Sequence, residues 1–115
     1  MHELSVTQSL VDTVVKAGED AGALKVIKVD LVIGKLNTYV PEIVKDYYQL
    51  LSEDTIAEGS ELNVTRIPGK VKCRNCSKES ELEDFRVFCP ECKSRDVELI
   101  KGREFYIKSL EIEEK

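Results

Sequence analysis

Apolar residues near the amino terminus recur at helical spacing. Four of them lie three or four positions apart: Leu10, Val11, Val14 and Val15. This period predicts an amphipathic helix over residues 4–21. Ser5-Val6-Thr7-Gln8 has the spacing of a capping box, in which the Ser5 and Gln8 side chains bond free backbone N–H groups at the start of a helix. Gly22 is suited to end this helix.

Residues 25–33 change to a period of two. Four aliphatic residues fall on one face of this segment: Ile27, Val29, Leu31 and Ile33. Lys28 and Asp30 fall on the opposite face. Alternation of this kind predicts a half-buried strand, which Gly34 ends.

A second helix and two further strands follow. Pro41 is well placed in the first turn of a helix, where its missing N–H is not needed. Apolar residues then return at helical spacing: Ile43, Val44, Tyr47, Leu50 and Leu51. Residues 62–67 predict a strand that Pro68-Gly69 ends. The last predicted strand contains Phe105, Ile107, Leu110 and Ile112.

These segments predict an α+β fold, with two helices packed on a small three-stranded sheet. A strand–helix–strand unit favours a right-handed parallel connection between the first two strands. The last strand must return to this sheet, because a lone strand is unstable in water. We expect a body formed by residues 1–68 plus 99–115 and an inserted, zinc-ribbon-like lobe at 69–98, where large aliphatic residues become rare and all four cysteines appear.

The cysteines form two Cys-x-x-Cys knuckles, Cys73-Arg74-Asn75-Cys76 and Cys89-Pro90-Glu91-Cys92, separated by 12 residues. Two thiolates of one tight turn can both reach an ion at about 2.3 Å, and a second turn completes a tetrahedron. The lobe also has little to bury: Val71, Leu82, Phe85, Val87 and Phe88. A segment this short needs a cross-link or a metal ion to be stable, so the sequence predicts a structural Zn²⁺ held by all four cysteines.

Other uses of four cysteines are less consistent with this sequence. Disulfides are not favoured in a chain with no visible export signal. A redox Cys-x-x-Cys needs one pair at the start of a helix and not two matched pairs. Iron in a rubredoxin-like site would use the same ligands and remains an alternative.

Composition and charge exclude several classes of function. The 115 residues contain 17 Lys and Arg against 22 Asp and Glu, a net charge of −5, and 42% are hydrophobic. Between residues 70 and 95 the net charge is only about +2, which is weak for a nucleic-acid-binding module. With no apolar run long enough to span a membrane and no signal peptide, we expect a cytoplasmic protein. One histidine and no nucleophile–base arrangement argue against an enzyme.

The single histidine occupies position 2. Without other information, an exposed terminal side chain with no role is the simplest interpretation. A residue-2 imidazole can, however, close chelate rings with the α-amine of Met1 and the amide nitrogen of His2. These nitrogens favour a square-planar ion such as Ni²⁺ or Cu²⁺ over zinc. Glu3 could supply a further donor.

Several motifs occur together in one order along nearly the whole chain. They are Met1-His2-Glu3-Leu4-Ser5, Ile33-Gly34-Lys35-Leu36, Pro41-Glu42, Thr55-Ile56-Ala57-Glu58-Gly59-Ser60-Glu61-Leu62, the two knuckles and Gly102-Arg103-Glu104. In this respect the chain resembles the HypA/HybF family of hydrogenase nickel-incorporation factors. One departure is that relatives often have histidines near the knuckles, whereas this chain has none.

The resemblance implies a nickel metallochaperone that delivers Ni²⁺ to the large subunit of [NiFe]-hydrogenase with a GTPase partner. It implies that His2 is the principal nickel ligand, assisted by Met1 and Glu3, and that Cys73, Cys76, Cys89 and Cys92 hold structural zinc. The alternative from the residues alone is a zinc-ribbon adaptor that binds protein or RNA without nickel.

Overall fold

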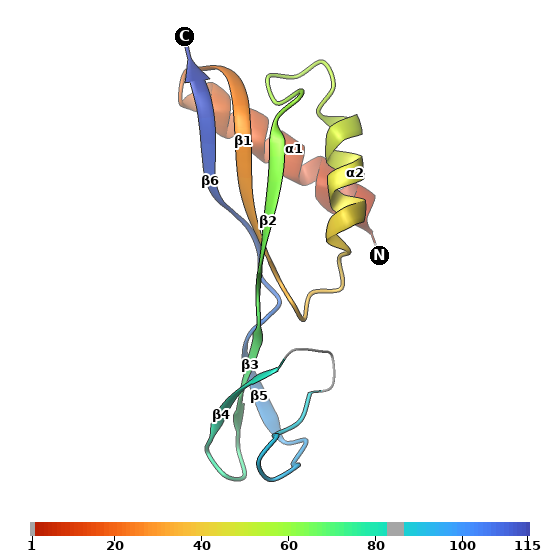
Figure 1. Ribbon diagram of the computed structural model, residues 1–115, viewed down its shortest axis with the longest axis vertical. Helices are drawn as coiled ribbons and strands as arrows, with labels where there is room; N and C mark the ends of the chain where they lie inside the picture. The colour runs from red at the N-terminus through yellow and green to blue at the C-terminus, as the bar shows by residue number, and fades with distance from the viewer. Residues whose placement is uncertain (1, 83–86) are drawn as a thin grey trace. The chain divides into compact units, whose positions relative to one another are not determined.

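The computed structural model describes residues 2–82 and 87–115 (Figure 1). Two helices and six strands occur in these residues. In chain order they are α1 (Glu3–Asp20), β1 (Ala23–Gly34), α2 (Pro41–Leu51), β2 (Glu61–Ile67), β3 (Gly69–Cys73), β4 (Glu79–Leu82), β5 (Val97–Lys101) and β6 (Phe105–Glu114). The predicted α+β class, with two helices, is therefore confirmed.

The chain forms two compact units. The helical unit comprises Met1–Leu31, Thr38–Thr65 and Tyr106–Lys115, and the cysteine unit comprises Val32–Asn37 and Arg66–Phe105. Each unit draws on segments that are distant in sequence, because long strands contribute their two ends to different units.

The helical unit contains α1, α2 and a three-stranded sheet in the order β2-β1-β6 (Figure 1). At one end of the sheet the N–H of Lys115 donates to the carbonyl of Gly22, so the end of β6 lies beside the start of β1. The last strand therefore returns to the first sheet, as predicted. The core is formed by α1, β1 and α2 residues that are almost fully buried: Val11, Val14, Val29, Leu31, Val44 and Tyr48.

The start of α1 differs from the prediction. The helix begins at Glu3, and its N-cap is His2, which has a left-handed backbone and no side-chain capping bond. The predicted capping box is wrong, because Ser5 already lies inside the helix and Gln8 bonds Asp12 instead. The end agrees with expectation, since α1 stops at Asp20 and Gly22 follows with φ +74°.

The residues of β1 that face the core also differ in part from those that the alternation predicted. Ile27 is 40% exposed, whereas Val26 is fully buried. Val26 lies beside Gly18 of α1, where there is no side chain to exclude it, and its N–H donates to the carbonyl of Ile56. Contact with α1 thus selects Val26, and the alternation resumes at Val29.

The cysteine unit contains a second three-stranded sheet in the order β4-β3-β5. Both pairings are antiparallel, and Val71 of β3 lies opposite Ser80 and Leu99. Val71 and Leu82 are buried as predicted, but Val87 is 40% exposed, which corrects its assignment to the core. Phe85, also predicted to be buried, lies outside the described residues.

Residues 32–37 belong to the cysteine unit because three of its segments meet there. The N–H of Lys35 donates to the carbonyl of Ile67, and that of Leu36 donates to the carbonyl of Gly102. The Leu36 side chain occupies the space that a Cβ at Gly69 would need. A Cβ at Gly102 would likewise lie only 2.9 Å from the Leu36 side chain, so this close packing accounts for glycine at positions 69 and 102.

Candidate metal sites

The two cysteine knuckles share one backbone hydrogen-bonding pattern. In the first, the N–H of Cys73 donates to the carbonyl of Lys78, and the N–H of Ser77 donates back to the carbonyl of Cys73. In the second, sixteen residues later, the N–H of Cys89 donates to the carbonyl of Ser94, and the N–H of Lys93 donates back to the carbonyl of Cys89. Ser77 and Lys93 both have a left-handed backbone, with φ of 64° and 65°. Each turn can therefore present both of its sulfurs on one side.

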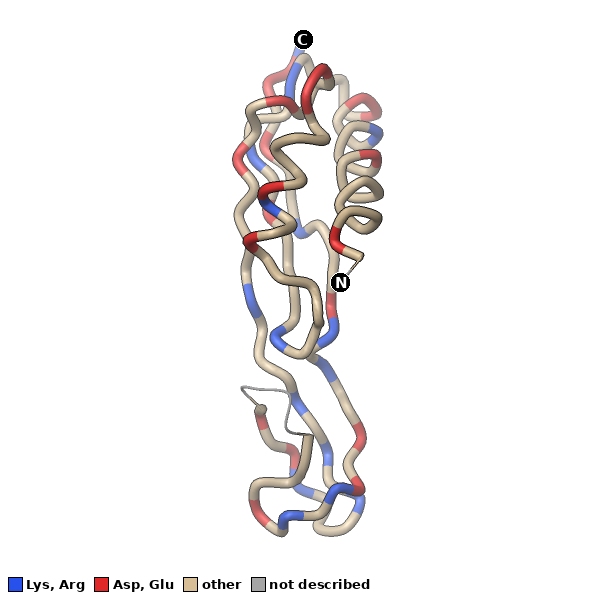
Figure 2. Tube along the Cα trace, turned by 90° about the vertical axis from the view of Figure 1, so that its right-hand side faces the viewer, with Lys and Arg blue, Asp and Glu red and all other residues tan. Residues whose placement is uncertain are grey.

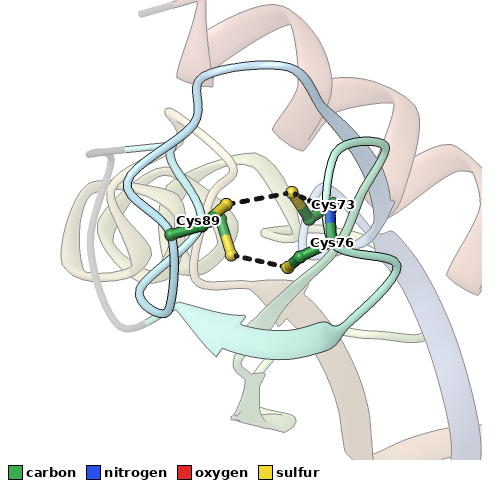
Figure 3. A group of neighbouring side chains, drawn as sticks. Cys73, Cys76 and Cys89 are labelled. Atoms are coloured by element: carbon green, nitrogen blue, oxygen red, sulfur yellow. Dashed lines mark hydrogen bonds between the residues drawn. The ribbon is translucent and has the colours of Figure 1, made fainter.

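The four sulfur atoms converge on one point. Figure 3 shows Cys73, Cys76 and Cys89 with their sulfurs directed toward a common centre. The Cys73 and Cys92 sulfurs are 3.5 Å apart, and those of Cys76 and Cys89 are 3.6 Å apart. All four lie within 4.8 Å of one another. Each close pair joins one knuckle to the other.

This arrangement fits a tetrahedral metal ion. With metal–sulfur bonds of about 2.3 Å, the edges of a tetrahedral Zn–S₄ site are about 3.8 Å long, close to the two shorter sulfur distances. Backbone N–H groups of Asn75 and Cys76 both lie 3.3 Å from the Cys73 sulfur and would stabilise its thiolate form. The donor set is the one that zinc prefers in structural sites.

The protein itself holds the two knuckles together. Arg74 of the first knuckle donates to the carboxylate of Asp96 at 3.0 Å and to the carbonyl of Val97. Lys78 pairs with Glu91 of the second knuckle at 3.7 Å. The Asn75 amide donates to the Cys92 sulfur at 3.6 Å. These contacts pre-arrange the four ligands.

As free thiols, the clustered cysteines differ in acidity. The N–H of Lys78 lowers the pKa of Cys76, but partial desolvation of its sulfur and bonding to the other thiols outweigh it and raise this pKa to about 11. The N–H of Ser94 and the amide of Asn75 lower the pKa of Cys92 to about 6. The Cys76 and Cys92 thiols thus bind their protons with different strengths, and a divalent cation can replace these protons.

The amino-terminal candidates lie at the start of α1. His2 is exposed, and its carbonyl accepts a hydrogen bond from the N–H of Val6. Glu3 is only 8% exposed, and its carboxylate accepts the N–H of Val40, the N-cap residue of α2, at 3.1 Å. Met1, the third predicted nickel ligand, lies outside the described residues.

Glu3 is therefore a structural residue as well as a candidate ligand. The positive amino terminus and then the Val40 N–H lower the pKa of the Glu3 carboxyl to about 2. The sequence did not indicate Val40 or Asn75 as parts of these sites, because the Cys and His pattern identifies ligands and not the N–H groups that support them. Only the folded chain brings their donor groups to Glu3 and Cys92.

In the described part of the cysteine unit, basic and acidic residues alternate along the chain. Figure 2 shows Lys and Arg interspersed with Asp and Glu there. Lys70 pairs with Glu79 and Arg74 pairs with Asp96, which neutralises part of the positive charge. Among the described helices, none has the length and apolar character needed to cross a membrane.

The chain is similar to known proteins over nearly its whole length. The family model described as "Hydrogenase/urease nickel incorporation, metallochaperone, hypA" matches residues 1–112. The hydrogenase maturation factor HypA of Caldanaerobacter subterraneus subsp. tengcongensis is 45% identical over 114 residues, covering 98% of this chain and 100% of that one. HypA of Dehalococcoides mccartyi strain CBDB1 is 41% identical, covering 99% and 96%.

Solved structures agree in fold. The solution structure of the Ni metallochaperone HypA from Helicobacter pylori covers 100% of both chains with a TM-score of 0.71 and 22% identity. A second solution structure of a HypA protein covers 97% of this chain and 96% of its own, with a TM-score of 0.72 and 23% identity. Together with the family match, these similarities show that the chain belongs to the HypA family of metallochaperones, which are not enzymes.

Proposed function

We propose that this protein binds Ni²⁺ at its amino terminus and delivers it to the large subunit of [NiFe]-hydrogenase in the cytoplasm, together with a GTPase. Family membership supports the nickel cargo and the hydrogenase recipient. The observation that bears most directly on the site is that the only imidazole of the chain is exposed at position 2.

The imidazole and amide nitrogens of His2 and the α-amine of Met1 would hold the ion. A set of nitrogen donors suits Ni²⁺ and does not suit a structural zinc ion, which prefers the sulfur cluster. Because the carboxylate of Glu3 is held by the N–H of Val40, we assign Glu3 mainly to positioning the site, with its carboxylate as an assisting donor.

The cysteine cluster would hold Zn²⁺ as a permanent structural ion. Its sulfurs come from two tight turns that are joined by the Lys78–Glu91 pair and by the Asn75 amide, which donates to the Cys92 sulfur. The sulfur site would therefore bind its ion tightly and stabilise the fold, whereas the terminal site would bind the cargo ion more weakly. The terminal site can release its ion through a small displacement of the first residues or through protonation.

The decisive experiment is a nickel titration of the untagged, zinc-loaded protein by calorimetry. We expect one Ni²⁺ per chain for the wild type and none for His2→Ala, with an unchanged circular dichroism spectrum. Two extra residues before Met1 should weaken binding nearly as much, because they remove the α-amine. Glu42→Ala, at an exposed position of α2, is the matched control and should bind nickel normally.

Two results would contradict the proposal. Nickel uptake by His2→Ala equal to that of the wild type would exclude the amino-terminal site. Stable zinc with no nickel uptake by the wild type would instead favour an adaptor function.

A further inference from the structure

We propose that Cys76 is the oxidant-sensitive ligand of the cysteine cluster, and that Cys89 completes its oxidation to a disulfide that releases the metal ion. This inference rests on the proposed zinc site. It goes beyond that site because it assigns different reactivities to four ligands of the same type.

Burial separates the four sulfurs into two classes. The first cysteine of each knuckle, Cys73 or Cys89, is 1% exposed. The second cysteine of each knuckle, Cys76 or Cys92, is exposed. A small oxidant arriving from solvent therefore meets Cys76 or Cys92 first.

The Asn75 amide then distinguishes the two exposed sulfurs. It donates to the Cys92 sulfur across the cluster at 3.6 Å. A hydrogen bond to a thiolate withdraws electron density from the sulfur and covers one direction of attack, so it lowers the nucleophilicity of Cys92.

Cys76 has no corresponding amide from the other knuckle. The position equivalent to Asn75 is Glu91, whose carboxylate only accepts hydrogen bonds and pairs with Lys78 at 3.7 Å. With zinc bound, all four sulfurs are thiolates, so access and hydrogen bonding decide which of them reacts. Access favours Cys76 and Cys92 over the two buried cysteines, and the hydrogen bond from Asn75 to Cys92 then favours Cys76.

Cys89 is placed to complete the reaction. The Cys76 thiolate attacks one oxygen of hydrogen peroxide, which forms an S–O bond, breaks the O–O bond and releases hydroxide. The Cys89 thiolate, whose sulfur is 3.6 Å from that of Cys76, then attacks the oxidised sulfur. An S–S bond forms and a second hydroxide leaves. The two hydroxides take up two protons from the buffer acid and become water, and zinc, which is not itself oxidised, loses two of its four ligands.

The test uses the full-length, zinc-loaded protein, whose metal content is first measured by mass spectrometry. Hydrogen peroxide is added in steps, zinc release is followed with a metallochromic indicator, and disulfides are mapped by peptide mass spectrometry. We expect zinc release to parallel formation of the Cys76–Cys89 linkage, with little Cys73–Cys92 linkage. Predominance of the Cys73–Cys92 linkage, or zinc release without any disulfide, would overturn the assignment.

A pair of variants tests the role of the amide. Asn75→Ala keeps the backbone N–H bond to Cys73 but removes the side-chain bond to Cys92. The Cys73–Cys92 linkage should then form about tenfold faster, as expected for loss of one hydrogen bond to a charged sulfur. Glu91→Ala, at the equivalent position of the second knuckle, should leave the linkage pattern unchanged.

Failure of this inference and failure of the zinc site give different results. A protein that contains no zinc contradicts the proposed zinc site. A protein with one zinc per chain that resists peroxide, or an Asn75→Ala variant with the wild-type linkage pattern, contradicts only the selective oxidation of Cys76.

Discussion

The carboxylate of Glu3 connects the first turn of α1 to the first turn of α2. It lies in a nearly buried position and accepts the N–H of Val40, a group that would otherwise lack a partner at the start of α2. The residue next to the candidate nickel ligand therefore fixes the segment that follows β1.

Replacing Glu3 should expose the Val40 amide. We expect Glu3→Ala to speed hydrogen exchange at Val40 about tenfold, because one hydrogen bond to a charged acceptor is lost. Glu3→Gln retains a side-chain oxygen and should have a smaller effect. Exchange is measured by NMR, and equal exchange rates at Val40 in wild type and Glu3→Ala would contradict this assignment.

Protons should compete with nickel at the amino terminus. Imidazole and amine nitrogens bind a metal only in their neutral forms, so each proton taken up displaces nickel. Nickel affinity should therefore fall steeply as the pH drops from about 7.5 to 6, whereas zinc should stay bound to the thiolates. Calorimetric titrations at both pH values, with zinc measured in parallel, test this; an unchanged nickel affinity would exclude binding by these nitrogens.

The segment between α2 and β2 is held by a buried chain of hydroxyl groups. Ser60 donates from its Oγ to the carbonyl of Ala57, so the Tyr48 hydroxyl donates to the Ser60 Oγ at 2.6 Å. Tyr48 is fully buried, and this burial raises its pKa, although the bond to Ser60 offsets part of the effect. The buried hydroxyl groups of Tyr48 and Ser60 are thus satisfied within the core of the helical unit, whereas the buried Thr7 hydroxyl of α1 has no partner among the described residues.

Deleting either hydroxyl should have unequal effects. Tyr48→Phe leaves Ser60 still bonded to Ala57 and should lower the free energy of unfolding by about 1 kcal/mol. Ser60→Ala leaves the buried Tyr48 hydroxyl without a partner, although the Ala57 carbonyl still accepts the backbone N–H of residue 60, and should cost about 2–3 kcal/mol. Urea denaturation followed by circular dichroism measures both, and a larger loss for Tyr48→Phe would reverse this order.

At the scale of the whole molecule, the two units differ in what stabilises them. The helical unit buries aliphatic residues from both helices and from β1. In the described part of the cysteine unit, by contrast, the buried aliphatic residues Val32, Ile33 and Leu36 lie in the segment at the end of β1, and β3 and β4 bury only a few large apolar side chains, Val71 and Leu82 among them. A core this small depends on a metal for stability.

Removing zinc should therefore unfold one unit selectively. After treatment with a chelator under reducing conditions, amides of β3 should lose protection from hydrogen exchange, while amides in the middle of α1 should retain it. Cys73→Ala should have the same effect without a chelator. Simultaneous loss of protection in β3 and α1 would show that the two units fold as one.

Much of the architecture could be predicted from the sequence because it depends on local patterns. Helical spacing predicted both helices, Pro41 marks the start of α2 as expected, and the two Cys-x-x-Cys knuckles predicted a cluster of four sulfurs. Each of these features depends on residues a few positions apart. Such patterns are set by backbone geometry, whatever surrounds them.

Tertiary contacts decided the remainder. Gly18 of α1 makes room for Val26, so Val26 and not Ile27 is buried. Glu3 meets Val40, and Asn75 meets Cys92, across long separations in sequence. The sequence by itself determined which groups could bind metals, because ligand chemistry belongs to the side chain. Only the folded chain decided which ligands are exposed, supported or already bonded, because these properties depend on neighbours that local spacing does not specify.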